Sequence, residues 1–407
     1  MFDMIPQGWK IVELSEIADG DYGIVDGPFG SNLKVSDYID DSVNGVPVLT
    51  TKNLNGDYSK DSVRYISKEK FDNLKRSAVT PGDIIVAKIG SIGKCGIYPL
   101  DQRIALIPAN LLKITPKSDV NRKYVFYCIQ SAEFQKRIKS IATATAQPAF
   151  NVTKFRKLPI PTPSLPEQNR IVARIEELFS ELDNGVETLR KTKQQLAVYR
   201  QAVLKEAFQK CIDRVPIQSV CKCVTDGDHM PPPKAPSGVP FVMISNVENS
   251  KILWDNTAYV SREYFNAIDS KRKPKKGDVL YTVTGSYGIP ILVDFKKEFC
   301  FQRHIALLRP NDNTLSEFLY YALMEPSVYA QATKGATGTA QKTVGLGVLR
   351  RMVIPYTSSV ELQERIVSEI EGRLSMCEHI SETVDVALHE AEAMRQSILK
   401  QAFEGRL

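Results

Sequence analysis

The chain repeats itself at a nearly constant spacing. The stretches YRQAVLKEAF and MRQSILKQAF, which end at Phe208 and Phe403, are almost identical and lie 195 residues apart. PGDIIVAKIGSIG (Pro81 to Gly93) matches KGDVLYTVTGSYG (Lys276 to Gly288) at the same spacing, and LPIPTPSLPE matches MVIPYTSSVE at 194 residues. Solenoid repeats have units of about 20–50 residues. A period this long therefore indicates the duplication of one domain together with one helix.

The duplication defines four segments. A chain of 407 residues is long enough for two or three domains at about 100–200 residues each, and the repeat favours two copies. In each copy a divergent part precedes a closely repeated part. We predict a first domain at 1–157, a first repeated segment at 158–210, a second domain at 211–351 and a second repeated segment at 352–407.

The two repeated segments predict long helices. Ser164-x-x-Glu167 and Ser358-x-x-Glu361 have the form of capping boxes, which satisfy free N–H groups at a helix start. Beyond each box, apolar residues recur at alternating spacings of four and three, as in the heptads of a coiled coil. The predicted seam comprises Ile171, Ile175, Leu178, Leu182, Leu189 and Leu196 in the first copy, and Ile366, Ile370, Ile380, Val384, Met394 and Ile398 in the second.

Helices of this length need a partner. A helix from Pro166 to Gln209 would extend ~65 Å at 1.5 Å per residue, far beyond an average globular helix. Because the two segments share one register, the simplest partner for each is the other, packed antiparallel in an intramolecular coiled coil. Two ordinary amphipathic helices, each lying on its own domain, are the alternative.

The divergent segments predict mixed α/β domains. Short β-rich runs such as DIIVAKIG (Asp83 to Gly90) and DVLYTVTG (Asp278 to Gly285) are separated by clusters of Gly, Pro, Asn and Asp. A helical stretch follows in each copy, NRKYVFYCIQSAEFQKRI in the first and LSEFLYYALMEPSVYAQAT in the second. The predicted fold class is therefore α+β, with two such domains separated by two long antiparallel helices in a pseudo-two-fold repeat.

Net positive charge is concentrated in the two divergent segments. Lysines and arginines minus aspartates and glutamates give +5 for 1–157 and +5 for 211–351, but +1 for 158–210 and −5 for 352–407. An excess on one domain is usually a solubility feature, whereas the same excess on both copies favours a polyanionic partner. Seven scattered cysteines, no membrane-length apolar run and no signal peptide lead us to expect a cytoplasmic protein without a membrane contact.

No stretch of the sequence completes a catalytic pattern. The GSIGK and GSYG turns do not complete a phosphate-binding loop, and the four histidines and the CKC pair lack metal-ligand spacing. We therefore expect neither a metal nor a cofactor, and no enzymatic activity in the isolated chain. DGPFGSNLK, with its glycines, serine, asparagine and lysine, suits a loop approaching a phosphate backbone but equally a plain turn.

Several stretches together resemble a known family. IPQGWKIVELSEIA, DGPFGSNLK, PGDIIVAKIGSIG, LPIPTPSLPEQNRIVARIEEL and IPYTSSVELQERIVSEIE are similar to the specificity subunit of type I restriction-modification systems, in order and in duplication. The resemblance implies two target-recognition domains, each reading half of a bipartite site on double-stranded DNA. It also implies that the helices hold two methyltransferase subunits and, in the full complex, restriction subunits, which carry methylation and cleavage.

Side-chain chemistry supplies the candidate DNA contacts. Lys and Arg suit phosphates, and polar side chains in loops suit base edges. The candidates are Asn32, Lys34, Ser91, Lys94 and Gln147 in the first domain, and Ser286, Tyr287, Arg303, His304 and Gln341 in the second. The alternative from another class is a coiled-coil scaffold whose basic domains bind an acidic protein without sequence-specific DNA recognition.

Overall fold

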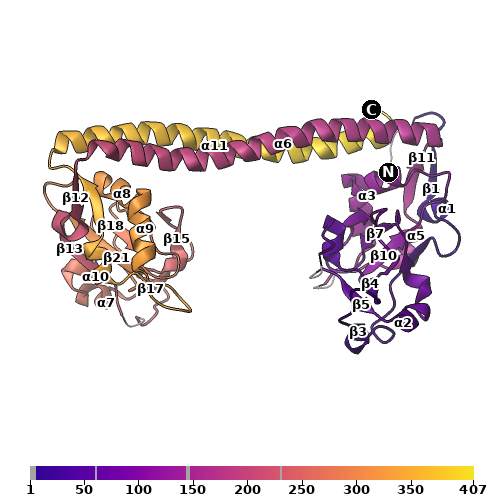
Figure 1. Cartoon of the computed structure of the whole chain (residues 1–407), viewed down its shortest axis with the longest axis horizontal. Helices are drawn as coiled ribbons and strands as arrows, with labels where there is room; N and C mark the ends of the chain where they lie inside the picture. Colours follow the sequence, from indigo (N-terminus) through magenta and orange to yellow (C-terminus); the bar gives the residue numbers. More distant parts are fainter. Residues whose placement is uncertain (1–5, 60–61, 144–146, 230–231) are drawn as a thin grey trace. The chain divides into compact units, whose positions relative to one another are not determined.

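The computed structural model describes residues 6–59, 62–143, 147–229 and 232–407 (Figure 1). The chain forms two compact units. The first comprises Met1–Thr188 together with Val386–Leu407, and the second comprises Leu189–Asp385. Each unit therefore contains one divergent domain and a part of both long helices.

The first unit is built on an antiparallel four-stranded sheet of order β2-β10-β7-β8. Alternate residues of β7 face opposite sides, as the two-residue period of a strand requires. Ile84 and Val86 pack in a core with helical residues, whereas Ile85 and Ala87 pack in a second core. The strands are β2 (Ile24–Asp26), β7 (Ile84–Ala87), β8 (Cys95–Ile97) and β10 (Leu111–Ile114).

A second sheet covers the far side of that second core. Its order is β3-β5-β4-β9-β6, and β4 and β9 run parallel. Helices α3 (Arg122–Gln130) and α4 (Ala132–Ser140) contribute Tyr124 and Phe134 to the first core. The strands of this sheet are β3 (Tyr38–Ile39), β4 (Val46–Val48), β5 (Arg64–Ile66), β6 (Ala78–Val79) and β9 (Ala105–Leu106).

The second unit repeats this topology. Its four-stranded sheet has the order β13-β21-β18-β19, and a smaller sheet β17-β14-β20 again contains one parallel pair. These elements are β13 (Cys221–Asp226), β14 (Val239–Val242), β17 (Ala258–Val260), β18 (Val279–Thr282), β19 (Pro290–Leu292), β20 (Cys300–Phe301), β21 (Ile305–Pro310), α8 (Ser316–Met324) and α9 (Pro326–Gly335). The mixed α/β character predicted for both divergent segments is confirmed.

Smaller elements join the sheets to the helices in both units. Strand pairs β1–β11 and β12–β22 are antiparallel, and each closes its domain just before a long helix. The first repeated segment, predicted to start at 158, thus opens with a strand. These elements are β1 (Lys10–Glu13), β11 (Pro159–Thr162), β12 (Asp213–Pro216), β22 (Val353–Tyr356), α5 (Val152–Arg156), α7 (Arg262–Ala267) and α10 (Leu346–Arg351).

The long helices are α6 (Leu165–Ala207) and α11 (Val360–Phe403). The start of α6 directly after Ser164 agrees with the predicted box. The predicted cap Ser358 is wrong by one residue, because the Leu362 N–H donates to Ser359 Oγ at 3.2 Å.

The helices pair antiparallel within each unit. In the first unit, Arg170 Nη2 donates to the Leu407 main-chain oxygen (2.9 Å), and Arg395 forms an ion pair with Asp183. In the second unit, Lys193 pairs with Asp385 at 2.6 Å and Glu206 with Arg373 at 2.9 Å. The residue numbers of the partners fall from 407 to 373 as those on α6 rise from 170 to 206. The predicted antiparallel coiled coil is therefore confirmed.

The predicted seam is wrong at two positions of α11. Ile380 and Met394 are 37% and 54% exposed. From Cys377 onward, the inward positions recur at spacings of four and then three, which places Ser381 and Arg395 inward instead. Of the other predicted positions, Ile171, Ile175, Ile366, Ile370 and Val384 are buried, and Leu178, Leu182, Leu189, Leu196 and Ile398 are half-buried.

Candidate nucleic-acid interface

An aspartate followed by a glycine ends the equivalent edge strand in both domains: Asp26 in β2 and Asp226 in β13. A Cβ at Gly27 would lie 2.1 Å from the Pro108 carbonyl carbon, and one at Gly227 would lie 2.0 Å from the Phe301 oxygen. No other residue fits such a close crossing of two backbone segments. Both aspartates are therefore held at a fixed point beside the turn that follows the edge strand.

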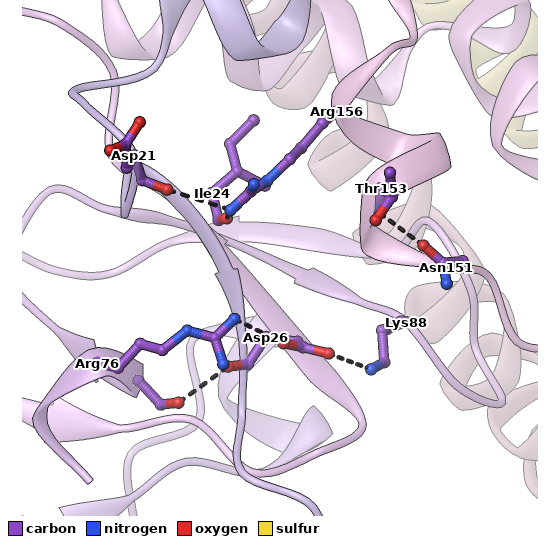
Figure 2. Close-up of polar contacts among 9 residues, drawn as sticks. Asp21, Ile24, Asp26, Arg76, Lys88, Asn151, Thr153 and Arg156 are labelled. Carbon is purple, nitrogen blue, oxygen red and sulfur yellow. Dashed lines mark hydrogen bonds and ion pairs between the residues drawn. The ribbon is translucent and has the colours of Figure 1, made fainter.

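Asp26 holds two cations (Figure 2). Its Oδ2 accepts from Lys88 Nζ at 2.7 Å, and its Oδ1 lies 3.5 Å from Arg76 Nη2. Asp26 and Lys88 are buried, whereas the Arg76 side chain is 57% exposed. The Ser77 hydroxyl donates to the Asp26 main-chain oxygen at 2.9 Å and ties the arginine's segment to the strand. The carboxylate thus lies within ion-pair distance of an arginine that faces solvent.

The loops that carry three predicted contacts meet around Lys88. Its ammonium lies 5.7 Å from the ring centre of the exposed Phe29, in the loop that carries Asn32 and Lys34. On the other side, the Phe150 N–H donates to the Lys88 carbonyl, in the segment that follows Gln147. Asn32, Lys34 and Gln147 are all exposed.

The second domain likewise places two basic side chains beside Asp226. Its carboxylate lies 2.9 Å from His229 Nε2 and 3.6 Å from Arg272 Nη2. Asp226 and His229 line a hollow of about 390 Å³, and three predicted contacts line it with them. These are Arg303, His304 and Gln341.

The pKa of His304 is lowered in this hollow. Burial is the main cause, and the neighbouring Arg303 guanidinium adds to it. At neutral pH the imidazole is therefore uncharged, and it can both donate and accept a hydrogen bond.

The two serines predicted as contacts occupy equivalent exposed turns. The Gly90 N–H donates to the Pro148 oxygen and the Gly285 N–H to the Lys342 oxygen, both at about 3 Å. These bonds bring the turn of Ser91 beside Gln147 and the turn of Ser286 beside Gln341. The structure thereby joins four predicted contacts in two matching pairs.

Lys94 and Tyr287 lie apart from the aspartate clusters. Lys94 lines a separate hollow that also contains Phe179 and Arg395 of the long helices. Tyr287 stacks on Tyr329, with ring centres 6.0 Å apart, and packs against the core. Neither residue joins the group around Asp26 or Asp226.

Comparison with known proteins agrees with this duplicated architecture. The family model for the type I restriction modification DNA specificity domain matches residues 6–196 and again 215–372. The chain belongs to this family of specificity subunits.

The EcoKI subunit of Escherichia coli strain K12 is 21% identical over 99% of this chain and 90% of its own length. The MjaVIII subunit of Methanocaldococcus jannaschii is 25% identical over 49% of this chain, and the EcoBI subunit of Escherichia coli 26% over 51%. Those two alignments span less than half of each relative, 45% and 42%.

Solved structures share the fold of this specificity subunit. A chain from a study of assembly and conformational transition of the type I R-M system has a TM-score of 0.73 at 19% identity, covering 99% of both chains. The HsdS subunit from Thermoanaerobacter tengcongensis has a TM-score of 0.57 at 20% identity, covering 99% of this chain and 98% of that one.

Besides Asp26, Asp226 and His229, the sequence analysis missed four residues of the specificity subunit's candidate interface: Arg76, Lys88, Asn110 and Arg272. One signal was available for Asn110, which lies 194 residues before His304. The Lys88 N–H donates to the Asn110 oxygen as the Val283 N–H donates to the His304 oxygen, at 2.8 and 2.9 Å. The other three are identified only by their distance to an aspartate.

Other paired arginines of the specificity subunit are structural. Arg156 donates to the Ile24 main-chain oxygen through Nε at 3.1 Å (Figure 2), and Arg350 Nη2 donates to the Val224 oxygen at 2.7 Å. Because these guanidiniums bond to the backbone of β2 and β13, they fix the strands that carry Asp26 and Asp226.

Among the described residues, no group of three or more His, Cys, Asp or Glu side chains could hold a metal ion. The cysteines are free thiols, and burial raises the pKa of Cys95 and of Cys221 to about 12. No helix within the described ranges is long and apolar enough to cross a bilayer.

Proposed function

We propose that this chain is the noncatalytic specificity subunit of a type I restriction-modification complex and that each of its domains reads half of a bipartite site on duplex DNA. The repeated cluster of basic side chains around Asp26 and Asp226 supports the proposal most directly. Two basic domains of matching topology carry exposed polar loops at equivalent strand ends, so each can meet one DNA segment. Divergent loops on a repeated frame allow the two half-sites to differ.

The long helices are the proposed docking surface for partner subunits. Because α6 and α11 repeat one another, they offer the same surface twice, which suits two methyltransferase subunits. Restriction subunits join in the full complex, and methylation and cleavage belong to these partners in the cytoplasm.

Within this function, the ten predicted residues remain the proposed DNA contacts, with different roles. Lys34, Lys94 and Arg303 suit phosphates, which position the protein. Asn32, Ser91, Gln147, Ser286, Tyr287, His304 and Gln341 suit base edges or the sugar-phosphate backbone.

Salt dependence tests the DNA role. Log Kd for duplex DNA should vary steeply with log salt, with a slope of about 0.9 per phosphate neutralised. Fluorescence anisotropy on duplexes containing the site mapped by adenine methylation in the host, compared with shuffled duplexes, measures both the slope and the preference. A flat salt response, or equal affinity for shuffled DNA, would instead favour a scaffold that binds protein.

Domain replacement tests whether each domain reads its own half of the DNA site. Replacing residues 1–157 with the matching domain of a relative should change one half of the methylated site and leave the other intact, because base contacts are local to each domain. Sequencing of methylated adenines in cells carrying the hybrid and its partner subunits measures this. The reciprocal replacement of 211–351 is the control. A simultaneous change in both halves would contradict the proposal.

His304 should report DNA binding through its protonation. Its folded-state pKa lies below the unfolded value, so protons favour the unfolded chain and its contribution to stability decreases as the pH falls. Nearby phosphates would favour the imidazolium, so we expect the NMR titration midpoint of the His304 ring to rise when duplex DNA binds. His379 and His389, in α11, are internal controls. An unchanged midpoint at saturating DNA would place His304 outside the interface.

A further inference from the structure

A carboxylate within a proposed DNA interface weakens DNA binding by repelling phosphates, unless it also has a structural role that favours binding. Asp26 and Asp226 accept hydrogen bonds only and repel phosphates. Yet each ends an edge strand at the centre of its domain's candidate interface, with the nearest guanidinium at 3.5 Å and 3.6 Å. The same arrangement occurs in both domains, although the loops around it differ in sequence.

The two arginines occupy equivalent places. Arg76 lies in a 3₁₀ turn, Lys75–Ser77, and Arg272 in another, Ser270–Arg272. These turns precede the inner strands β7 and β18 of the four-stranded sheets, with the short strand β6 between turn and β7 in the first domain. Their side chains are 57% and 35% exposed, so each guanidinium keeps donors for a further acceptor. A second basic side chain, Lys88 or His229, contacts the other carboxylate oxygen.

We propose that Arg76 and Arg272 are equivalent DNA-contacting arginines, one in each recognition domain, and that Asp26 and Asp226 are the positioning residues that orient them. The inference rests on the proposed function and deepens it. A guanidinium held at one edge by a carboxylate presents its remaining N–H groups in a fixed direction, which suits the paired acceptors of a phosphate or of a guanine O6 and N7.

The direction in which Asp26→Asn changes DNA affinity shows whether Asp26 orients Arg76 or only lies near the DNA. Asp26→Asn removes a negative charge at nearly constant shape. If Asp26 only lay near DNA, losing its charge would strengthen binding, because the repulsion disappears. If it orients Arg76, binding should weaken despite the gain in net positive charge. Asp226→Asn makes the same distinction in the second domain.

The test uses the full chain and duplexes that contain the mapped site or have one half-site shuffled. Arg76→Gln should weaken binding roughly 5- to 150-fold, the loss expected for one specific arginine contact. Asp26→Asn should weaken it in the same direction. In the Arg76→Gln background, Asp26→Asn should have little further effect on affinity, because the guanidinium that Asp26 orients is absent. If Arg76 contacts a base edge, these effects should vanish on duplexes whose first half-site is already shuffled; if it contacts a phosphate, they should persist there.

Asp226→Asn and Arg272→Gln should show the same pattern for the second half-site only. The matched control is Lys75→Gln, since Lys75 adjoins Arg76 but pairs at 3.0 Å with the exposed Asp72. Its effect should be small and should add to that of Asp26→Asn. Far-ultraviolet circular dichroism and undiminished discrimination at the unaltered half-site establish that each variant is folded.

The outcomes separate the inference from the proposed function. Relaxed preference at one guanine assigns Arg76 to a base edge, and uniform weakening with a salt slope lower by about one assigns it to a phosphate; both support the proposal. Tighter binding by Asp26→Asn, or additive effects of the two substitutions, would overturn it while leaving the proposed function intact. If the unmodified chain does not prefer the mapped site, the proposed function itself fails.

Discussion

A fragment of residues 1–210 will form a homodimer with symmetric DNA specificity. In the full chain, Ile171 and Ile175 of α6 share a core with Leu399, Ala402 and Phe403 of α11, all of them buried. The fragment lacks that part of α11. Leaving such side chains in water costs about 1.5–3 kcal/mol for each large one. The fragment therefore needs a replacement for residues 386–407.

A second copy of the fragment can supply it. Leu204, Ala207 and Phe208 lie 195 residues before Leu399, Ala402 and Phe403 and are buried in the second unit. Phe208 meets Phe318 edge to face with ring centres 5.4 Å apart, as Phe403 meets Tyr124 at 5.2 Å. Two copies related by a two-fold axis would bury both seams.

Light scattering and methylation mapping check this prediction. The dimer presents two identical recognition domains, so with the methyltransferase partner it should modify a palindromic version of the first half-site. Ala207→Asp should prevent dimerisation because Ala207 is buried, whereas Ala202→Asp, at an exposed position of the same helix, should not. A well-folded monomeric fragment, or a dimer selecting an asymmetric site, would contradict the two-fold frame.

Asp278→Ala will destabilise the second unit by about 3–5 kcal/mol, the usual result of removing one partner of a buried ion pair. Asp278 is 2% exposed, and both its oxygens accept from the Arg309 guanidinium at 2.8 Å. The side-chain hydrogen bonds to Asp278 raise the pKa of Arg309, and the substitution would leave that charge half-buried and unpaired. The substitution removes the contact between Asp278, which directly precedes β18, and Arg309 of β21.

The two tryptophans allow each unit to be followed separately. Trp9 lies in the first unit and Trp254 in the second, so variants that keep one tryptophan report urea unfolding of one unit. The matched control is Glu298→Ala, which breaks an arginine–carboxylate pair at 2.5 Å whose side chains are 54% and 62% exposed. Exposed pairs contribute about 0–1 kcal/mol. Equal losses in the two variants, or an equal shift of the Trp9 transition, would contradict the prediction.

Periodicity in the sequence was sufficient to predict the two long helices and the central strands of both domains. Heptad spacing over some forty residues indicates a long paired helix, and α6 and α11 form over almost the predicted ranges. Runs such as DIIVAKIG alternate between two cores because strand side chains alternate between faces. The phase of the seam near Met394 was wrong, because Arg395 can turn inward, with its guanidinium 4.8 Å from the Phe179 ring centre and its charge paired with Asp183.

The sequence by itself determined the duplication, the fold class and the family resemblance, since each depends on patterns repeated along the chain. Only the tertiary structure decided which charged residues act together. Asp26, Arg76 and Lys88 lie 50 and 62 residues apart in sequence and have no shared spacing that marks them. They meet because an edge strand, a 3₁₀ turn and a central strand end at one corner of the fold. A Coulomb interaction depends on distance in space, and sequence spacing does not specify that distance.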